Sequence, residues 1–535
     1  MSTPQLRRGA AVGGIHPAVF EQRMRELGLV ALTALIPATL ALGVTVALPQ
    51  ISLMLVLAVI AGVLAIVAMM VTSRMEVTVS LLAVYLLMLD GPVKLLLPAR
   101  ELTASMPNVL IFAVCAGALM RLVVRRERPG MPPLSGWVLG FVGIVVVESF
   151  NPHTEGVLKI LAGFREELQW VPFFWFGYLL MRSKRRLRQL FLIVGVAALA
   201  NGLVSAYQTR LSPTALAAWG PGYHLLIYPS HGASRVYTTG EGEARVRPPG
   251  LGSDEGFGAG VGQIALPFAL ALLAAAWRPR RRWVPILLCL GALLAIITGL
   301  GRSQIIGGAL AALAFALLAA RAGPRVRARV LGALATIGVL AVPCVVGLVL
   351  VLRHGTFSRY ESIASASRLA EAPGYKNDAR SLIFSELEVN PFGVGLGTAG
   401  PTSGVGGASN YVQEQYRAIS DETEFNVLAN EVGIPGDLMW LALSLYMLVL
   451  CARGMKLVQD RELALYLAGV LAAFPALFIG GFSGALNSSA AAGPYYWFAI
   501  GVAAYWFVGS GRRSRMMLPT PDSGGLAPGS MAAVA

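Results

Sequence analysis

Four arginines in this chain have positions at which a guanidinium group could do chemistry. Arg302 lies in a tight Gly-Arg-Ser turn between two apolar runs, Arg247 precedes a segment rich in Gly and Asp, Arg165 precedes an apolar run, and Arg380 lies in a long polar segment. A guanidinium offers a planar fork of donors that fits a phosphate group and stays charged when partly desolvated. These residues predict a site for a phosphate-bearing molecule. Each could instead reach toward a polar surface or pair with a carboxylate, as Arg380 could with Glu386.

Acidic residues supply the second half of a reactive site. Asp421, Glu422 and Glu424 fall within four positions, just before an apolar run. A carboxylate can accept the proton of an attacking hydroxyl group, so each of the three is a candidate general base. The alternative is a set of acids in the first turn of a helix, where the helix dipole favours negative charge. A further acid, Asp90, lies four residues before Lys94 inside an apolar run, which predicts an ion pair on one helix face.

The composition determines what kind of chain must position these residues. Of the 535 residues, 56% are hydrophobic and only 13% are charged, and the mean hydropathy is +0.66. These values exclude an ordinary soluble enzyme, a disordered chain and a disulfide-rich secreted module. The net charge of +15 does not imply nucleic acid, because basic residues also set membrane topology. The four cysteines lie in or at the end of apolar runs without metal-ligand spacing, so no metal or cofactor is expected.

Apolar runs long enough to cross a bilayer predict an all-α polytopic membrane protein with about fourteen (12–14) transmembrane helices. The runs lie near residues 28–49, 51–72, 78–99, 107–124, 133–149, 169–182, 190–208, 257–277, 284–300, 304–320, 330–352, 433–451, 462–484 and 493–508. The sixth run is short, and the segment before it is expected to be amphipathic. Most of the 43 basic residues fall on the side that holds both termini, so the positive-inside rule places both termini in the cytoplasm.

This topology divides the chain into membrane and loop regions. The predicted parts are a cytoplasmic N-terminus (1–27), N-terminal membrane helices (28–208), a periplasmic loop (209–256), central membrane helices (257–352), a large periplasmic loop (353–432), C-terminal membrane helices (433–508) and a disordered cytoplasmic tail (509–535). We expect short helices rather than a sheet in the large loop. The cytoplasmic connections are short and contain no nucleotide-binding motif. Trp170, Trp440 and the aromatic run 495–497 are expected at the membrane interfaces.

The order and placement of several short motifs resemble one bacterial superfamily. The turn Gly301-Arg302-Ser303 is followed by an apolar run, and the large loop carries Arg380, Pro391 and the segment Gly393-Val394-Gly395. A Leu-rich segment with a glutamate and Gly-Ile-Pro-Gly, residues 428–436, then returns to the membrane. These features, with Arg165 and Arg247 upstream, resemble the O-antigen ligase and Wzy-type polysaccharide polymerase superfamily over roughly residues 145–510. Members of that superfamily are membrane glycosyltransferases of GT-C-like architecture.

The resemblance implies a reaction outside the cytoplasm of a bacterium, at its inner membrane. The donor and acceptor would be undecaprenyl-diphosphate-linked oligosaccharides, without a metal or other cofactor, and a chain-length regulator would be a further partner. Arg302 would act in catalysis on the diphosphate, with Arg247, Arg165 and Arg380 binding substrate. Glu422 stands where ligases of the superfamily carry a histidine, so it is the first candidate for the general base.

Three other functions remain open at this stage. The missing histidine favours a polymerase of polysaccharide repeat units over a ligase that transfers finished glycan to lipid A core or to a protein. A secondary transporter or lipid flippase would also have many spans, but the long loop 353–432 and the scarcity of charges deep in the spans disfavour it. A structural membrane scaffold would leave the placed arginines without a role.

Overall fold

A computed structural model describes most of the chain from Met75 to Val508. The described residues are 75–97, 106–116, 118, 131–154, 156–229, 235–238, 242, 244–276, 281–351, 360, 383–400, 403, 405, 423–487 and 489–508. The chain falls into two units, one holding residues 1–78 and 109–128, the other holding 79–108 and 129–535. All that follows on packing and on the site concerns the second, larger unit.

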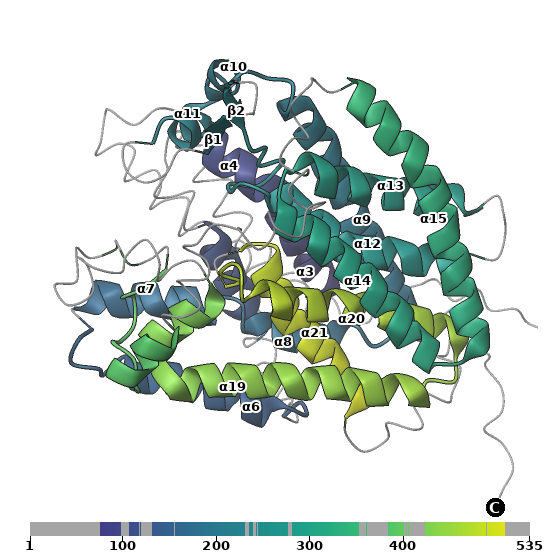
Figure 1. The fold of residues 1–535 in the computed structure, drawn as a ribbon. Helices are drawn as coiled ribbons and strands as arrows, with labels where there is room; N and C mark the ends of the chain where they lie inside the picture. The colour runs from purple at the N-terminus through teal and green to yellow at the C-terminus, as the bar shows by residue number, and fades with distance from the viewer. Residues whose placement is uncertain are drawn as a thin grey trace, which may run out of the picture. The chain divides into compact units, whose positions relative to one another are not determined.

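Helices dominate this structure (Figure 1). In chain order the elements are α3 (Met75–Val84), η1 (Tyr85–Leu89), α4 (Asp90–Leu96), α6 (Ser135–Glu148), α7 (Val157–Leu168), α8 (Pro172–Leu180), α9 (Lys184–Gln208), α10 (Pro213–Ala217), α11 (Pro221–Ile227), β1 (Val236–Thr238), β2 (Ala244–Val246), α12 (Phe257–Ala275), α13 (Trp283–Thr298), α14 (Arg302–Arg321), α15 (Pro324–Val351), α19 (Glu424–Gly454), η3 (Met455–Leu457), α20 (Arg461–Gly480) and α21 (Ala492–Phe507). The antiparallel pair β1–β2 pairs Val236 with Val246. It lies in the predicted loop 209–256, whereas the large loop contributes a helical segment over 383–389.

The apolar helices are consistent with an all-α membrane protein. Seven helical segments are long and apolar enough to cross a bilayer: Met75–Leu96, Lys184–Gln208, Phe257–Ala275, Arg302–Arg321, Pro324–Leu348, Glu424–Leu457 and Arg461–Gly480. Shorter apolar helices at Met106–Ala116, Ser135–Glu148 and Trp283–Thr298 follow three more of the predicted runs. The first two predicted runs, 28–49 and 51–72, lie outside the described residues, as does the tail 509–535. The total of about fourteen therefore stays a prediction.

The core of the larger unit is built around α12, which is buried along almost its whole length. Helices α9 and α13 pack against it and against each other through small residues. A Cβ atom on Gly202 of α9 would lie 2.8 Å from the Ala295 nitrogen of α13, and one on Gly291 would lie 2.7 Å from the Leu199 Cβ. Small residues at such crossings let helices approach closely, and this is the usual basis of helix association in membranes.

A second core lies among α6, α8, α19 and α21, and it corrects one prediction. Trp170, Trp440 and Trp497 were expected at the membrane interfaces, but all three are almost completely buried in the protein. The Trp440 ring stacks on Tyr496 with centroids 4.3 Å apart and packs against Phe141 at 5.7 Å. The prediction was wrong because large aromatic side chains also fill the crossings between helices, a role that sequence position does not distinguish.

The outermost helix, α15, presents apolar side chains outward. Val339 is 72% exposed and Val342 is 63% exposed, although both are aliphatic. In water such a helix would leave a large apolar face uncovered, whereas in a bilayer the same face is solvated by lipid tails. The exposed aliphatic side chains therefore agree with a membrane environment.

The helices of the larger unit have two chemically different ends. At the end that we call the site end, α9 and α20 finish and α12, α14 and α19 begin. A Cβ atom on Gly258 at the start of α12 would lie 3.0 Å from the Ser205 hydroxyl near the end of α9, and the Glu424 N–H donates to the Gly481 carbonyl at 3.0 Å. The opposite end, where α9 and α20 begin, carries arginines on several helices, including Arg188, Arg321, Arg325, Arg327 and Arg453.

Candidate functional site

Helix α19 is interrupted near its start, and the backbone groups at the break form hydrogen bonds with residues 391–400, which we call the glycine-rich loop. Gly433 has φ 60° and ψ −158°, a backbone conformation that favours glycine, so the helix breaks there. The Ile434 N–H donates to the Pro391 carbonyl at 2.9 Å, and the Asn430 carbonyl accepts from the Val394 N–H at 2.6 Å. In an uninterrupted helix Ile434 would donate to Asn430. The two predicted motifs, 391–395 and 428–436, therefore form one interlocked unit.

Helix α7, which carries the predicted site residue Arg165, packs on the same loop. A Cβ atom on Gly163 would lie 2.5 Å from the Leu396 Cβ, and one on Gly397 would lie 2.5 Å from the Lys159 carbonyl oxygen. Contacts this short require glycine on both surfaces. Arg165, two residues after Gly163, is thereby brought to the site end next to the loop, with its own side chain exposed.

Helix α7 is amphipathic, as predicted, but its apolar face is exposed and its charged face is buried. This is the reverse of an amphipathic helix on a soluble protein. Val157, Leu158 and Leu161 are more than half exposed, whereas Lys159 and Glu167 are almost completely buried. The Lys159 ammonium donates to the carbonyls of Gly397 and Ser403 at 3.3 and 2.9 Å. An apolar face turned outward suits a helix that lies at the membrane surface with its polar face against the protein.

Three glutamates from two distant parts of the chain come together in the interior of the site end. Glu167 of α7 and Glu424 and Glu431 of α19 are each at most 1% exposed. Burial raises the pKa of Glu167 well above its ordinary value, and the charges of Glu431 and Glu424 add to the shift. Like charges that share a buried site disfavour one another's ionisation, so the proximity of the three carboxyl groups adds to the effect of burial.

Backbone and amide donors hold the three carboxylates in place. Glu424 accepts from the backbone N–H groups of Leu486 and Asn487 at 2.6 and 3.0 Å, and the Asn487 side chain donates to Glu167 at 3.2 Å. The Ala399 N–H donates to Glu431 at 3.2 Å. One oxygen of each carboxylate is thus engaged, whereas Glu167 Oε1 and Glu424 Oε1 are buried without a hydrogen-bond partner among the described residues. Such groups are rare in structural cores and mark this cluster as a candidate functional feature.

One further carboxyl group lies closer to the surface and has a pKa suited to proton transfer. Glu386, on the helical segment 383–389, is half-buried and accepts from the Asn426 amide at 3.5 Å. Burial raises the pKa of Glu386 to about 7, although the amides of Asn426 and Asn430 act in the opposite direction. A carboxyl group that titrates near neutral pH can both accept and return a proton during a reaction.

The arginines Arg247 and Arg302 lie on adjoining segments at the same end. Arg247 forms an ion pair with Glu255 at 2.6 Å, and Arg235 approaches the same carboxylate at 3.4 Å. Arg302 is the first residue of α14, and a Cβ atom on Gly256 would lie 3.2 Å from the side-chain nitrogen of Gln304, in the same turn of α14. Two arginines thus share the one carboxylate of Glu255.

The pair Asp90–Lys94 connects the arginine region with α7. The predicted ion pair is confirmed at 2.8 Å. Asp90 is within electrostatic range of Asp254 and Arg165. A π-helical stretch, η1, lies directly before α4. Pro92 is the third residue of α4, directly after this stretch.

The structure thus brings together three of the predicted site residues, Arg165, Arg247 and Arg302, at one end of the helices. The other two, Arg380 and Glu422, lie outside the described residues, so their roles stay predictions. Among the described residues, no cluster of His, Cys, Asp or Glu is arranged to hold a metal ion. Neither a model of a known protein family nor a curated protein matches this chain.

The sequence indicated Glu424 as one of three candidate bases, but it did not indicate that Glu424 clusters with Glu167 and Glu431. Glu424 and Glu431 are seven residues apart, which places both on one face of a helix, and this spacing could have suggested that they act together. Glu167 follows Arg165 in an amphipathic segment, but no local pattern links it to residues more than 250 positions away. Glu386 was considered only as a partner for Arg380.

Proposed function

We propose that this chain is a membrane glycosyltransferase of the O-antigen ligase and Wzy-type polymerase superfamily. Its substrates would be undecaprenyl-diphosphate-linked oligosaccharide repeat units, which it would join into a surface polysaccharide. The observation that carries the proposal is the convergence of α7, the glycine-rich loop and the kinked start of α19 at the end that also holds Arg247 and Arg302. The resemblance in motif order implies a common function for these same segments.

The proposed orientation places the site end in the periplasm. The arginines of the opposite end lie on the loops and helix ends that the positive-inside rule assigns to the cytoplasm. Both termini would then be cytoplasmic, in an inner membrane. A reaction at the periplasmic face has no access to cytoplasmic nucleotide sugars, which favours a donor that is already attached to a lipid.

The proposed chemistry is the transfer of a glycosyl group between oxygens. The bond between the anomeric carbon and the diphosphate oxygen breaks, and a bond to the acceptor hydroxyl oxygen forms. The diphosphate leaves with the bonding electron pair and gains negative charge, and the hydroxyl proton passes to a carboxylate. Arg302 and Arg247, with Arg165, would stabilise the charge that develops on the diphosphate. Arg380 would close on the bound substrate.

Two carboxylates are proposed for the proton transfer. Glu422 is the base that the motif order predicts. Glu386 is the described carboxyl group with a pKa near 7, and it lies beside Asn426 in the first turn of α19. The buried carboxylates of Glu167, Glu424 and Glu431 would fix the position of this region. Glu424 accepts a hydrogen bond from the turn that follows α20, and Glu431 accepts one from the glycine-rich loop.

The purified protein in liposomes, supplied with lipid-linked repeat units, tests this function. The proposal predicts a ladder of lipid-linked products that differ by one repeat unit, with release of undecaprenyl diphosphate. Transfer of finished glycan to lipid A core with no ladder would favour the ligase instead. Movement of intact labelled lipid across the membrane, with no new glycosidic bond, would replace the proposal by a transporter.

A further inference from the structure

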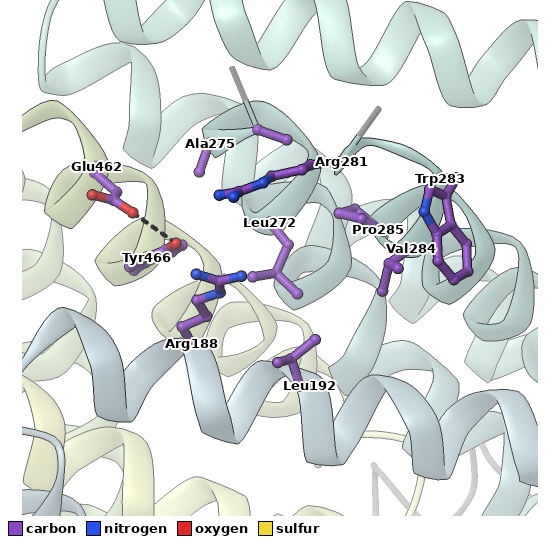
Figure 2. A pocket seen from close by; sticks show the side chains of 11 residues that line it. Arg188, Leu192, Leu272, Ala275, Arg281, Trp283, Val284, Pro285, Glu462 and Tyr466 are labelled. Carbon is purple, nitrogen blue, oxygen red and sulfur yellow. Dashed lines mark hydrogen bonds between the residues drawn. The ribbon is translucent and has the colours of Figure 1, made fainter. Parts of the chain in front are cut away.

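A pocket of about 680 Å³ opens at the opposite end of the helices, away from the candidate site. It lies among the beginnings of α9, α13 and α20 and the end of α12, and Figure 2 shows its lining from close by. Arg188 and Arg281 enter it from different walls, with the Leu272 side chain between them in the view. The pocket thus presents two positive charges over an apolar floor.

The two arginines of the pocket are not directly paired within the described part of the chain. Neither Arg188 nor Arg281 forms a hydrogen bond or an ion pair with another described residue. The single carboxylate in the lining, Glu462, is already engaged, because it accepts from the Tyr466 hydroxyl at 2.9 Å and lies 3.5 Å from the Lys184 ammonium. An anionic group would therefore find two guanidinium forks available for phosphate.

The rest of the lining is suited to the apolar part of a lipid. Leu192, Val284 and Pro285 form apolar walls, and Trp283 stands at the pocket with 65% of its surface exposed. Beyond the pocket, Leu287 of α13 is also exposed, so the apolar surface continues along the outside of the helix. A tryptophan beside a basic, partly apolar pocket between helices is typical of a binding site for an acidic lipid headgroup.

We propose that this pocket binds the phosphate headgroup of an anionic phospholipid, with Arg188 and Arg281 on the phosphate and the acyl chains along α13. The orientation proposed above puts the lipid in the cytoplasmic leaflet. A water-soluble anion would gain nothing from the apolar walls, whereas a phospholipid satisfies both the charge and the exposed apolar surface. The lipid would occupy a site distinct from that of the lipid-linked donor.

Quenching of Trp283 fluorescence measures this binding directly. The full-length protein is placed in phosphatidylcholine liposomes that contain a small, equal fraction of either brominated phosphatidylglycerol or brominated phosphatidylcholine. The fluorescence of Trp283 is obtained by subtracting the fluorescence of the Trp283→Phe variant from that of the parent protein. We expect quenching by brominated phosphatidylglycerol to exceed that by brominated phosphatidylcholine several-fold. Equal quenching by the two lipids would overturn the proposal.

Charge variants test whether the two arginines cause the preference for phosphatidylglycerol over phosphatidylcholine. Arg188→Gln with Arg281→Gln is expected to remove the preference, and the matched pair Arg188→Lys with Arg281→Lys is expected to keep most of it. Arg185→Gln, on the same turn of α9 but outside the pocket lining, controls for general surface charge and should change nothing. A preference that survives in the glutamine pair, or disappears in the lysine pair, would contradict the assignment.

A competition arm separates the phospholipid from the prenyl carrier, which offers the same phosphate chemistry. Unbrominated phosphatidylglycerol should relieve the quenching at least as well as undecaprenyl phosphate does at the same fraction. Much stronger relief by undecaprenyl phosphate would mean that the pocket holds the carrier lipid and not a phospholipid. None of these measurements depends on catalytic activity, so they stand apart from the test of the proposed function.

Discussion

The Ile434 N–H and the Asn430 carbonyl, which would bond to each other in a continuous helix, both form hydrogen bonds with the glycine-rich loop instead. Ile434 donates to Pro391 at 2.9 Å, and Asn430 accepts from Val394 at 2.6 Å. Pro435 follows directly and has no N–H to donate, so it cannot form the next helical hydrogen bond and favours a break at this point. The exchange anchors the loop to the helix that carries Glu424 and Glu431.

The first prediction concerns the glycine at the centre of this exchange. Gly393 has φ 82°, and a Cβ atom there would lie 2.8 Å from the Glu431 carbonyl oxygen, so Gly393→Ala should lower stability by about 1–3 kcal/mol. Gly400→Ala is the matched control, because φ is also positive (70°) but the nearest atom would lie 3.6 Å away. Thermal unfolding in detergent should show the larger loss for Gly393→Ala. Equal losses would mean that backbone strain alone, and not the contact with α19, decides the effect.

The second prediction concerns Arg302, which begins α14. If it stabilises the leaving diphosphate, Arg302→Ala should reduce the rate of polymer formation about 10²–10³-fold with expression intact. Arg321→Ala is the control, since Arg321 ends the same helix at the opposite end. Turnover of lipid-linked repeat units by the two variants in liposomes provides the comparison. Parental turnover in Arg302→Ala would remove Arg302 from the mechanism.

The third prediction concerns the pH dependence of activity. The pKa of Glu386 is raised to about 7 by burial, so a base at this position is protonated and inactive below that pH and becomes active above it. Activity should therefore rise through pH 7. Glu386→Gln should lower the rate about 10²–10⁴-fold and remove this rise, whereas Glu388→Gln, on the exposed face of the same segment, should leave it unchanged. An unaltered pH profile in Glu386→Gln would leave Glu422 as the candidate base.

The fourth prediction concerns stability and the buried carboxylates. The pKa of Glu167 is higher in the folded than in the unfolded protein, so the folded state keeps a proton that the unfolded state releases. Stability from this group is complete below about pH 4.3, the unfolded pKa, and falls as pH rises, by at most about 1.4 kcal/mol per pH unit.

Glu167→Gln mimics the protonated carboxyl at every pH and tests this linkage. The variant should match the parent near pH 4.3 and unfold at a higher temperature than the parent at pH 8, as followed by thermal unfolding in detergent. Glu388→Gln should keep the parental slope. A slope in Glu167→Gln as steep as in the parent would show that Glu167 does not hold the extra proton.

Much of the fold could be predicted from the sequence because membrane spans are local patterns. Apolar runs marked α9, α12, α14 and α20 correctly, since length and hydropathy alone decide whether a segment can cross a bilayer. The ion pair Asp90–Lys94 was predictable for the same reason, being fixed by helical spacing. The burial of Trp440 was not, because an aromatic side chain at a helix crossing and one at a membrane interface have the same local sequence.

The candidate site was predicted only in part. Motif order pointed to Arg165, Arg247 and Arg302, and the structure brings their segments to one end. The cluster of Glu167 with Glu424 and Glu431 depends on contacts between residues far apart in the chain, and spacing cannot indicate such contacts. Asn487, which donates to both Glu167 and Glu424, stands in a turn with no recognisable motif.

The size distribution of surface glycan in a strain that lacks this protein tests the central claim most directly. The proposed polymerase predicts that single repeat units remain on the lipid carrier, and that the parent gene restores the polymer whereas Arg302→Ala does not. Full-length polymer accumulating on the carrier, unattached to its final acceptor, would contradict the polymerase and would assign the same site to a ligase.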